Sequence, residues 1–161
     1  MIIRDETEAD WAGVRRVEEA AFPGPDEAQL VDRLRADGDL TLSLVAVDGD
    51  EIVGHVAFSE MTAPFRALGL APVAVSPTRQ KTGIGAALIR AGLARATNDG
   101  WRGVFVLGDP PYYQRFGFDV ALAAGFRCRH AGEHFMVKAL GAALPALSGE
   151  VDYARAFAAL D

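Results

Sequence analysis

The sequence predicts one mixed α/β domain over residues 1–161. Segments with helical periodicity alternate with short β-branched, apolar runs, and this alternation is typical of a sheet covered by helices. Asp48-Gly49-Asp50 joins two such runs and is a strong hairpin signal. A third observation is a pair of glycines, Gly83 and Gly85, that follow an apolar run and open a long periodic segment. Together these features predict a central sheet flanked by helices.

A strand and two helices are expected in the N-terminal part. Residues 1–5 alternate weakly and predict a short strand. Thr7 and Asp10 resemble a capping box, and apolar residues then recur at helical spacing. Phe22-Pro23-Gly24-Pro25 ends that helix, and a second helix is expected over Asp26–Ala36, with Gly38 as its stop.

The middle of the chain predicts a hairpin, a central strand, a long helix and a further strand. The hairpin strands are Leu40–Val47 and Glu51–Ser59, and Leu68–Val75 is apolar enough to be buried on both faces. Pro72 conflicts with a central strand, because proline cannot donate to a β-ladder and usually marks an edge or a bulge. The long helix is expected over Gly83–Asn98 and the next strand over Trp101–Leu107.

The C-terminal part carries weaker signals. Asp109-Pro110 places a favoured N-cap residue before a proline and predicts a short helix through Tyr113. Three closing strands are expected, over 118–121, 126–129 and 134–140, whereas residues 142–161 give no clear prediction.

Composition excludes several classes of protein. Half of the residues are hydrophobic and 24% are charged, as in ordinary globular proteins. Cys128 is the only cysteine, so an internal disulfide or a cysteine-based metal cluster is excluded, and a cytoplasmic location is expected. The start does not resemble a signal peptide, and no run is long enough to cross a bilayer, so we expect no membrane partner. A net charge of −6 argues against nucleic acid and mildly favours a small or cationic substrate.

The most informative segment is the loop from Gln80 to Ala86. Free N–H groups at a helix start bind phosphates well, and glycine lets an anion approach the backbone closely. Gln80 and Lys81 add side-chain donors, with Arg79 as a third candidate. The loop therefore predicts a pyrophosphate site. It is not a P-loop, because Gly85 is followed by Ala86-Ala87, and Leu88 stands where a dinucleotide fingerprint needs a small residue.

Two motifs carry a family resemblance. Gln80-x-x-Gly83-x-Gly85 resembles the coenzyme A signature of the GNAT superfamily of N-acetyltransferases. The segment Gly108–Phe118 is similar to the Tyr-x-x-x-Gly-Phe helix of that superfamily, and its fuller form looks like the bacterial, YhbS-like branch of predicted acetyltransferases. The order of expected elements fits from Met1 to about Leu140.

The resemblance implies the GNAT acyl-CoA N-acyltransferase fold, in which two parallel strands of a mixed sheet splay apart. The splayed strand would carry a bulge, which explains Pro72, and the gap would hold the pantetheine arm. Acetyl-CoA is thus the implied cosubstrate, and its acetyl group would pass to a primary amine by direct attack in a ternary complex. The implied cofactor-binding residues are Val73, Val75, Gln80, Lys81, Thr82, Gly83, Ile84, Gly85 and Ala86.

Catalytic candidates are fewer. Tyr113 aligns with the tyrosine that in many members protonates the leaving thiolate. Glu60 lies near the expected amine, although a solvated surface glutamate is the simpler interpretation. Cys128 is interpreted as a small buried hydrophobic residue, and the spacing of the histidines is not typical of metal ligands. The acceptor could be a small-molecule or a peptide amine, and a homodimer is left open. The alternatives are another acyl chain, a non-catalytic acyl-CoA sensor and a nucleotide-binding protein.

Overall fold

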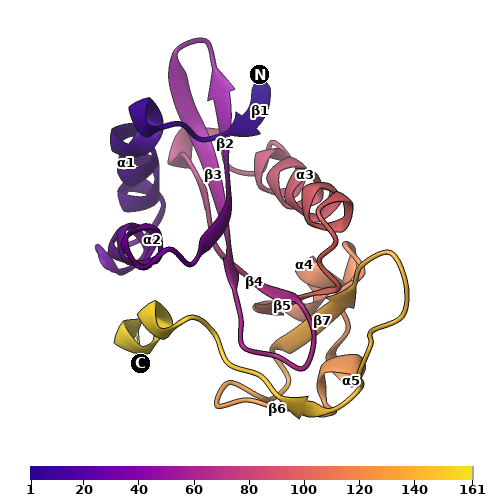
Figure 1. The fold of residues 1–161 in the computed structure, drawn as a ribbon. Coiled ribbons are helices and arrows are strands. Elements are labelled where there is room, and N and C mark those ends of the chain that lie inside the picture. The colour runs from indigo at the N-terminus through magenta and orange to yellow at the C-terminus, as the bar shows by residue number, and fades with distance from the viewer. Residues whose placement is uncertain (161) are drawn as a thin grey trace.

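A six-stranded mixed sheet organises the protein (Figure 1), whose computed structural model describes residues 1–160. Neighbouring strands run antiparallel except β4 and β5, which are parallel. The strand order is β1-β2-β3-β4-β5-β7. The strands are β1 (Ile2–Asp5), β2 (Leu40–Asp48), β3 (Glu51–Glu60), β4 (Ala67–Val75), β5 (Gly103–Leu107) and β7 (Phe135–Ala139). The predicted hairpin is β2–β3, and the predicted central strand is β4.

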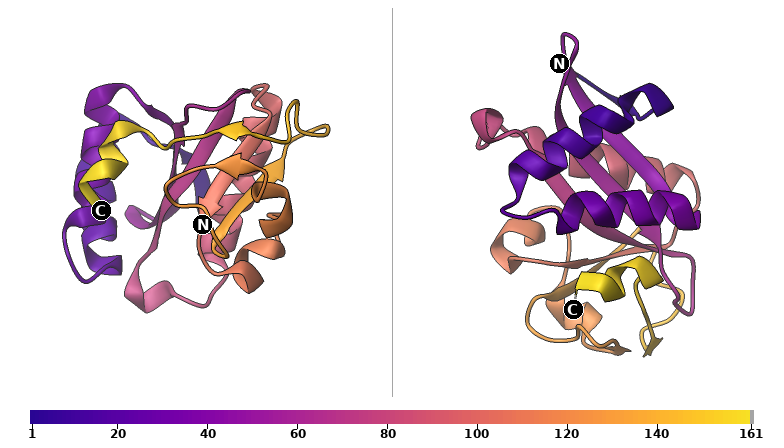
Figure 2. Two further views of the ribbon diagram at one scale, coloured as in Figure 1. Left: turned by 90° about the horizontal axis from the view of Figure 1, so that it is seen from below. Right: turned by 90° about the vertical axis from the view of Figure 1, so that its left-hand side faces the viewer.

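Helices cover both faces of this sheet (Figures 1 and 2). Two of them, α1 (Trp11–Ala21) and α2 (Asp26–Asp37), lie on one face, and α3 (Ile84–Asn98) lies on the other. The predicted capping box is present at Thr7 and Asp10, and Gly38 ends α2 with a left-handed φ of 78°. The mixed α/β class predicted from the sequence is therefore confirmed.

The sheet opens between β4 and β5. These strands are paired only where Ala67–Gly69 faces Gly103–Phe105, after which they separate. On its other edge, β4 is irregular: Val56 of β3 pairs with Val73 while Phe58 pairs with Leu70, so Ala71 and Pro72 occupy a bulge. Pro72 has no backbone N–H, and the bulge places it where the β-ladder needs no N–H donor. The splay and the bulge expected from the family resemblance are both present.

Gly92 lets α3 approach the sheet closely. A Cβ at this position would lie 2.1 Å from Cε1 of Phe58, a side chain that is itself fully buried. We expect Gly92→Ala to lower the free energy of unfolding by about 1–3 kcal/mol, because the added methyl overpacks a rigid core. Denaturant unfolding measures this effect. Gly24→Ala is the control, since no atom lies within 4 Å of a Cβ there; equal effects of the two substitutions would contradict the prediction.

Two elements near the C-terminus differ from expectation. Residues 118–121 were expected as a strand, but only Asp119 bridges to Val137, and α5 (Val120–Ala123) follows it. The Asp119 side chain accepts a hydrogen bond from the N–H of Leu122, so this residue caps a helix instead of continuing a strand. The expected strand over 126–129 is reduced to β6 (Phe126–Arg127).

The segment that gave no sequence prediction has a defined course. It contains β8 (Gly149–Glu150), which pairs with β6, and a 3₁₀ helix, η3 (Arg155–Leu160). In Figure 2, left, the yellow C-terminal segment crosses from the small β6–β8 pair to the helices on the opposite side. The guanidinium of Arg155 binds the carboxylate of Asp37 in α2, with N···O distances of 3.1 and 3.2 Å. Asp161 lies outside the described residues.

Candidate active site

The loop between β4 and α3 has the geometry of an anion cradle. A short 3₁₀ turn (Pro77–Arg79) leads into Lys81 and Gly83, whose φ angles of 65° and 89° are both left-handed. Ala87 donates its N–H to the carbonyl of Gly83, at 3.0 Å. The N–H groups of the turn before Ala87 therefore have no acceptor within the helix and can bind an anion.

A cavity of about 360 Å³ adjoins this loop and extends to the short helix α4 (Pro110–Gln114). Val75 lies on one side of it, and Tyr112 and Arg115 lie on the other. Val73 lies behind Gly85, 4.0 Å from the point that a Cβ of Gly85 would occupy. Thr82 does not line the cavity; its hydroxyl donates to the carbonyl of Arg79. The predicted residues that line the cavity are Val75, Gln80, Lys81, Gly83, Ile84, Gly85 and Ala86.

Two predicted phosphate donors are engaged elsewhere in this structure. The guanidinium of Arg79 binds the carboxylate of Asp48 in the β2–β3 turn at 2.7 Å, although Arg79 lines the cavity. The side-chain amide of Gln80 donates to the carbonyl of Val75 at 3.2 Å. Gln80 thereby holds the end of β4 against the loop. The backbone N–H groups and Lys81 are left as the donors of the cradle.

Arg115 is a cavity residue that the sequence analysis did not single out. Its guanidinium lies over the ring of Tyr112, 4.1 Å from the centroid, at the rim of the cavity. The cation–π contact fixes a positive charge facing the cradle. The sequence signal that could have identified Arg115 is its position in the Gly108–Phe118 motif, one helical turn after Tyr112.

Tyr113 lies on α4, on the same side of the sheet as α3. Its ring packs tightly against Gly108, where a Cβ would lie 2.3 Å from the ring, and against Phe118. Burial, with a smaller contribution from Tyr112, raises the pKa of Tyr113 to about 12. Within residues 1–160 its hydroxyl has no hydrogen-bond partner. Tyr113 is therefore a neutral phenol with a free hydroxyl; it packs against the core beside α3 and, unlike Tyr112, does not line the cavity next to the cradle.

Comparison with known proteins agrees with this geometry. Residues 2–121 match the family model described as the acetyltransferase (GNAT) domain. The chain belongs to the GNAT family. The acyltransferase class predicted from the sequence is confirmed by this membership.

Relatives match nearly the whole GNAT chain. The uncharacterized N-acetyltransferase YhbS of Escherichia coli K12 is 38% identical over 160 residues, which is 95% of this chain and 96% of that protein. The crystal structure of E. coli YhbS in complex with CoA matches with a TM-score of 0.91 at 36% identity, covering 98% of this chain and 91% of that one. A GNAT acetyltransferase from Brucella melitensis in complex with acetyl-CoA matches at 0.82 and 41%, covering 97% of each chain. The GNAT fold and the YhbS-like branch are thus confirmed.

The remaining candidate residues named in the sequence analysis of this GNAT chain lie outside the cradle. Glu60 is exposed at the end of β3, opposite Leu68, which still pairs with β5, and its carboxylate has no partner within residues 1–160. Its role as a base stays a prediction. Cys128 is half-buried, and burial raises the pKa of its thiol, as befits a packing residue. His130 is half-buried next to Cys128, His134 is exposed, and His55 is buried.

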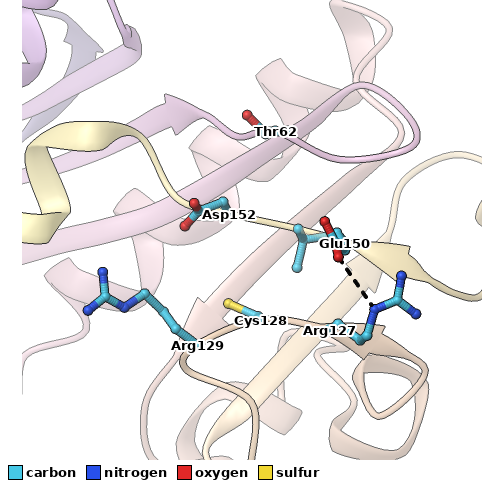
Figure 3. A pocket seen from close by; sticks show the side chains of 7 residues that line it. Thr62, Arg127, Cys128, Arg129, Glu150 and Asp152 are labelled. Atoms are coloured by element: carbon cyan, nitrogen blue, oxygen red, sulfur yellow. Dashed lines mark ion pairs between the residues drawn. The ribbon is translucent and has the colours of Figure 1, made fainter.

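A larger cavity, of about 470 Å³, lies away from the GNAT cradle (Figure 3). It lies at the β6–β8 pair, where Thr62, Cys128 and Asp152 line it together with residues of the two strands. Arg127 and Glu150 form an exposed ion pair there, with an N···O distance of 3.8 Å. Size alone therefore does not identify the site, since neither the glycine loop nor Tyr113 reaches this cavity.

A buried polar triad lies on the opposite face of the sheet from α3. His55 Nδ1 is 2.6 Å from Oε2 of Glu18, and His55 Nε2 is 2.8 Å from Oγ of Ser43. Burial raises the pKa of Glu18 to about 9 and lowers that of His55 to about 4. Both groups are accordingly neutral at pH 7, with the carboxylic acid donating to Nδ1 and Nε2–H donating to Ser43. Ser43 lies on β2, so the triad links α1 to the sheet, and it is not a nucleophilic site because Glu18, Ser43 and His55 are all buried.

Proposed function

We propose that this protein transfers the acetyl group of acetyl-CoA to a primary amine. The cradle of free N–H groups around Gly83 and Gly85 carries the proposal, because it fits a pyrophosphate and its cavity reaches Val75, at the end of the strand that parts from β5. The pantetheine arm would lie along Val73 and Val75. Solved relatives bind CoA or acetyl-CoA, which supports the same cosubstrate here.

The residues around the gap assist transfer without a covalent enzyme intermediate. Acetyl-CoA supplies an activated acyl group as a thioester. Tyr113 offers a hydrogen bond to the departing sulfur; with a pKa of about 12 it is a weaker acid than a thiol near 8.5, so the hydrogen bond matters more than complete proton transfer. We infer direct attack by the amine in a ternary complex. We infer a cytoplasmic location from the single cysteine. Among residues 1–160, no helix is both long and apolar enough to cross a bilayer.

Calorimetric titration with acetyl-CoA, followed by a thiol-release assay over a panel of small-molecule and peptide amines, tests the proposal. We expect saturable binding and amine-dependent release of CoA. Binding without release for any amine would favour the acyl-CoA sensor. Absence of CoA binding would reject both functions.

Tyr113→Phe tests the assisting phenol. We expect kcat to fall by about tenfold to a hundredfold, the range of one proton-transfer or hydrogen-bonding group, with little change in the affinity for acetyl-CoA. The substitution keeps the packing against Gly108 and Phe118, so the protein should stay folded. Steady-state kinetics at saturating acetyl-CoA measure the effect, and an unchanged kcat would remove Tyr113 from the mechanism.

A further inference from the structure

Tyr153, in the C-terminal segment that the sequence did not explain, lies at the point where β4 and β5 part. A Cβ on Gly69 would lie 2.8 Å from Cδ1 and Cε1 of the Tyr153 ring. Gly69 is the last residue of β4 that pairs with β5, opposite Phe105. The ring of Tyr153 therefore covers the vertex of the splay, on the face opposite α3.

The two faces of the splay carry one phenol each. Leu68 and Leu70 pack with α3 and with Tyr113, whereas Gly69 points its open side to the other face, where Tyr153 packs with Phe105 and Met61. Tyr113 nevertheless contributes to raising the pKa of Tyr153, after burial and Cys128, so the two phenols are electrostatic neighbours across the sheet. The gap between β4 and β5 begins between them.

The hydroxyl of Tyr153 is buried and has no protein partner. Only three side-chain oxygens of residues 1–160 are in this state, and two of them, Tyr153 OH and Ser59 Oγ, are on neighbouring positions of this face, because Ser59 pairs with Gly69. Tyr153 is 7% exposed and Ser59 is fully buried. A buried hydroxyl without a partner costs stability, so its retention calls for an explanation, and a ligand that supplies the missing hydrogen bond is one.

We propose that the Tyr153 hydroxyl binds the attacking amine of the acceptor, with Ser59 as a second contact. The proposal rests on the proposed acetyl transfer. The phenol oxygen would accept an N–H hydrogen bond and so direct the nitrogen lone pair at the acyl carbon. The C–N bond then forms, the C–S bond breaks with its electron pair going to sulfur, and the amine releases its proton to water. Tyr153 keeps its own proton throughout, because burial holds its pKa far above neutral.

This assignment gives the C-terminal segment a function. The ring of Tyr153 is held by Phe157, 5.0 Å away between centroids, and by His130, 5.6 Å away. The segment is tied to α2 through Arg155 and Asp37. Primary amines on apolar stems fit best, since Tyr153 belongs to an apolar cluster that includes Met61, Phe105 and Phe157.

A bisubstrate probe tests the assignment without knowledge of the natural acceptor. The probe is CoA bearing an S-linked CH₂–CO–NH–butyl group, whose amide N–H takes the place of the amine. We expect the wild-type protein to bind it more tightly than CoA, and Tyr153→Phe to weaken probe binding by about three- to tenfold, the value of one neutral hydrogen bond. The affinity for CoA itself should not change. The melting temperature should stay constant or rise, because the substitution removes an unpaired hydroxyl.

Ser59→Ala should weaken probe binding less than Tyr153→Phe. With any amine that proves to be turned over, Tyr153→Phe should raise the KM for the amine and lower kcat, leaving the KM for acetyl-CoA unchanged. Equal binding of probe by wild type and Tyr153→Phe would overturn the assignment while leaving the proposed function intact. A loss of CoA affinity or of stability in Tyr153→Phe would show a structural role instead. If the wild type binds neither CoA nor probe, the proposed function itself fails.

Discussion

Gly85→Asp should abolish acetyl-CoA binding at concentrations that saturate the wild type. Gly85 is the second residue of α3, and a Cβ there would point between Val75 and Tyr112, 3.5 Å from each. A carboxylate in that place would face the pyrophosphate across about 4 Å, which costs about 4 kcal/mol at an effective dielectric constant of 20. We therefore expect the Kd measured by calorimetry to rise by at least about a hundredfold.

The substitution separates binding from folding. An aspartate in the first turn of a helix interacts favourably with the helix dipole, so the melting temperature of Gly85→Asp should not fall. Gly85→Ala should weaken binding less, because its methyl group makes only ordinary van der Waals contacts in this structure. Gly24→Asp adds the same charge at an exposed glycine with open space around it and should leave Kd unchanged. Wild-type affinity in Gly85→Asp would place the pyrophosphate elsewhere.

The cradle could be predicted from the sequence because its chemistry is local. Glycines at fixed spacing, a preceding apolar strand and a following periodic helix specify a free helix N-terminus without any long-range contact. The hairpin at Asp48-Gly49 is local in the same sense. Pro72 was informative because it contradicted its surroundings, and the bulge resolves that contradiction.

Features that depend on distant contacts could not be predicted. Residues 118–121 have the composition of a strand, but Asp119 caps a helix instead. Tyr153 is an ordinary tyrosine in the sequence and becomes notable only when the chain folds back onto Gly69. Glu18 is one of two adjacent glutamates on α1, and nothing local pairs it with His55, 37 residues away.

The buried pair of Glu18 and His55 should make the protein less stable as the pH rises from about 6.5 to 9. The pKa of Glu18 is raised from 4.5 to about 9, so its contribution to stability is complete below pH 4.5 and is lost as the pH rises through 9. The pKa of His55 is lowered from 6.5 to about 4, so its contribution is complete above pH 6.5 and is lost as the pH falls through 4. Between pH 4.5 and 6.5 the pair holds one proton in both the folded and the unfolded state, and the two effects cancel.

Above pH 6.5 the unfolded pair has lost its proton while the folded pair keeps it. The free energy of unfolding should then fall with a slope of one proton, on the order of 1 kcal/mol per pH unit and a few kcal/mol in total by pH 9. Urea unfolding at a series of pH values measures the slope. Other groups titrate in the same range, so the decisive quantity is the difference from a variant that lacks only the Glu18 proton.

Glu18→Gln is that variant. The glutamine amide can still donate to Nδ1 of His55, so the contact at the core is kept while the titration is removed. We expect the free energy of unfolding of Glu18→Gln to rise between pH 4 and 6.5, because only His55 then titrates, and to be level above pH 6.5. The difference in stability between Glu18→Gln and the wild type should therefore grow steadily in favour of Glu18→Gln from pH 4.5 to 9. Glu19→Gln, at the neighbouring exposed position of α1, should follow the wild-type curve. Parallel curves for Glu18→Gln and wild type would mean that the folded pair does not keep this proton, so that Glu18 is ionised beside a neutral His55, and would reject the protonation assigned to Glu18.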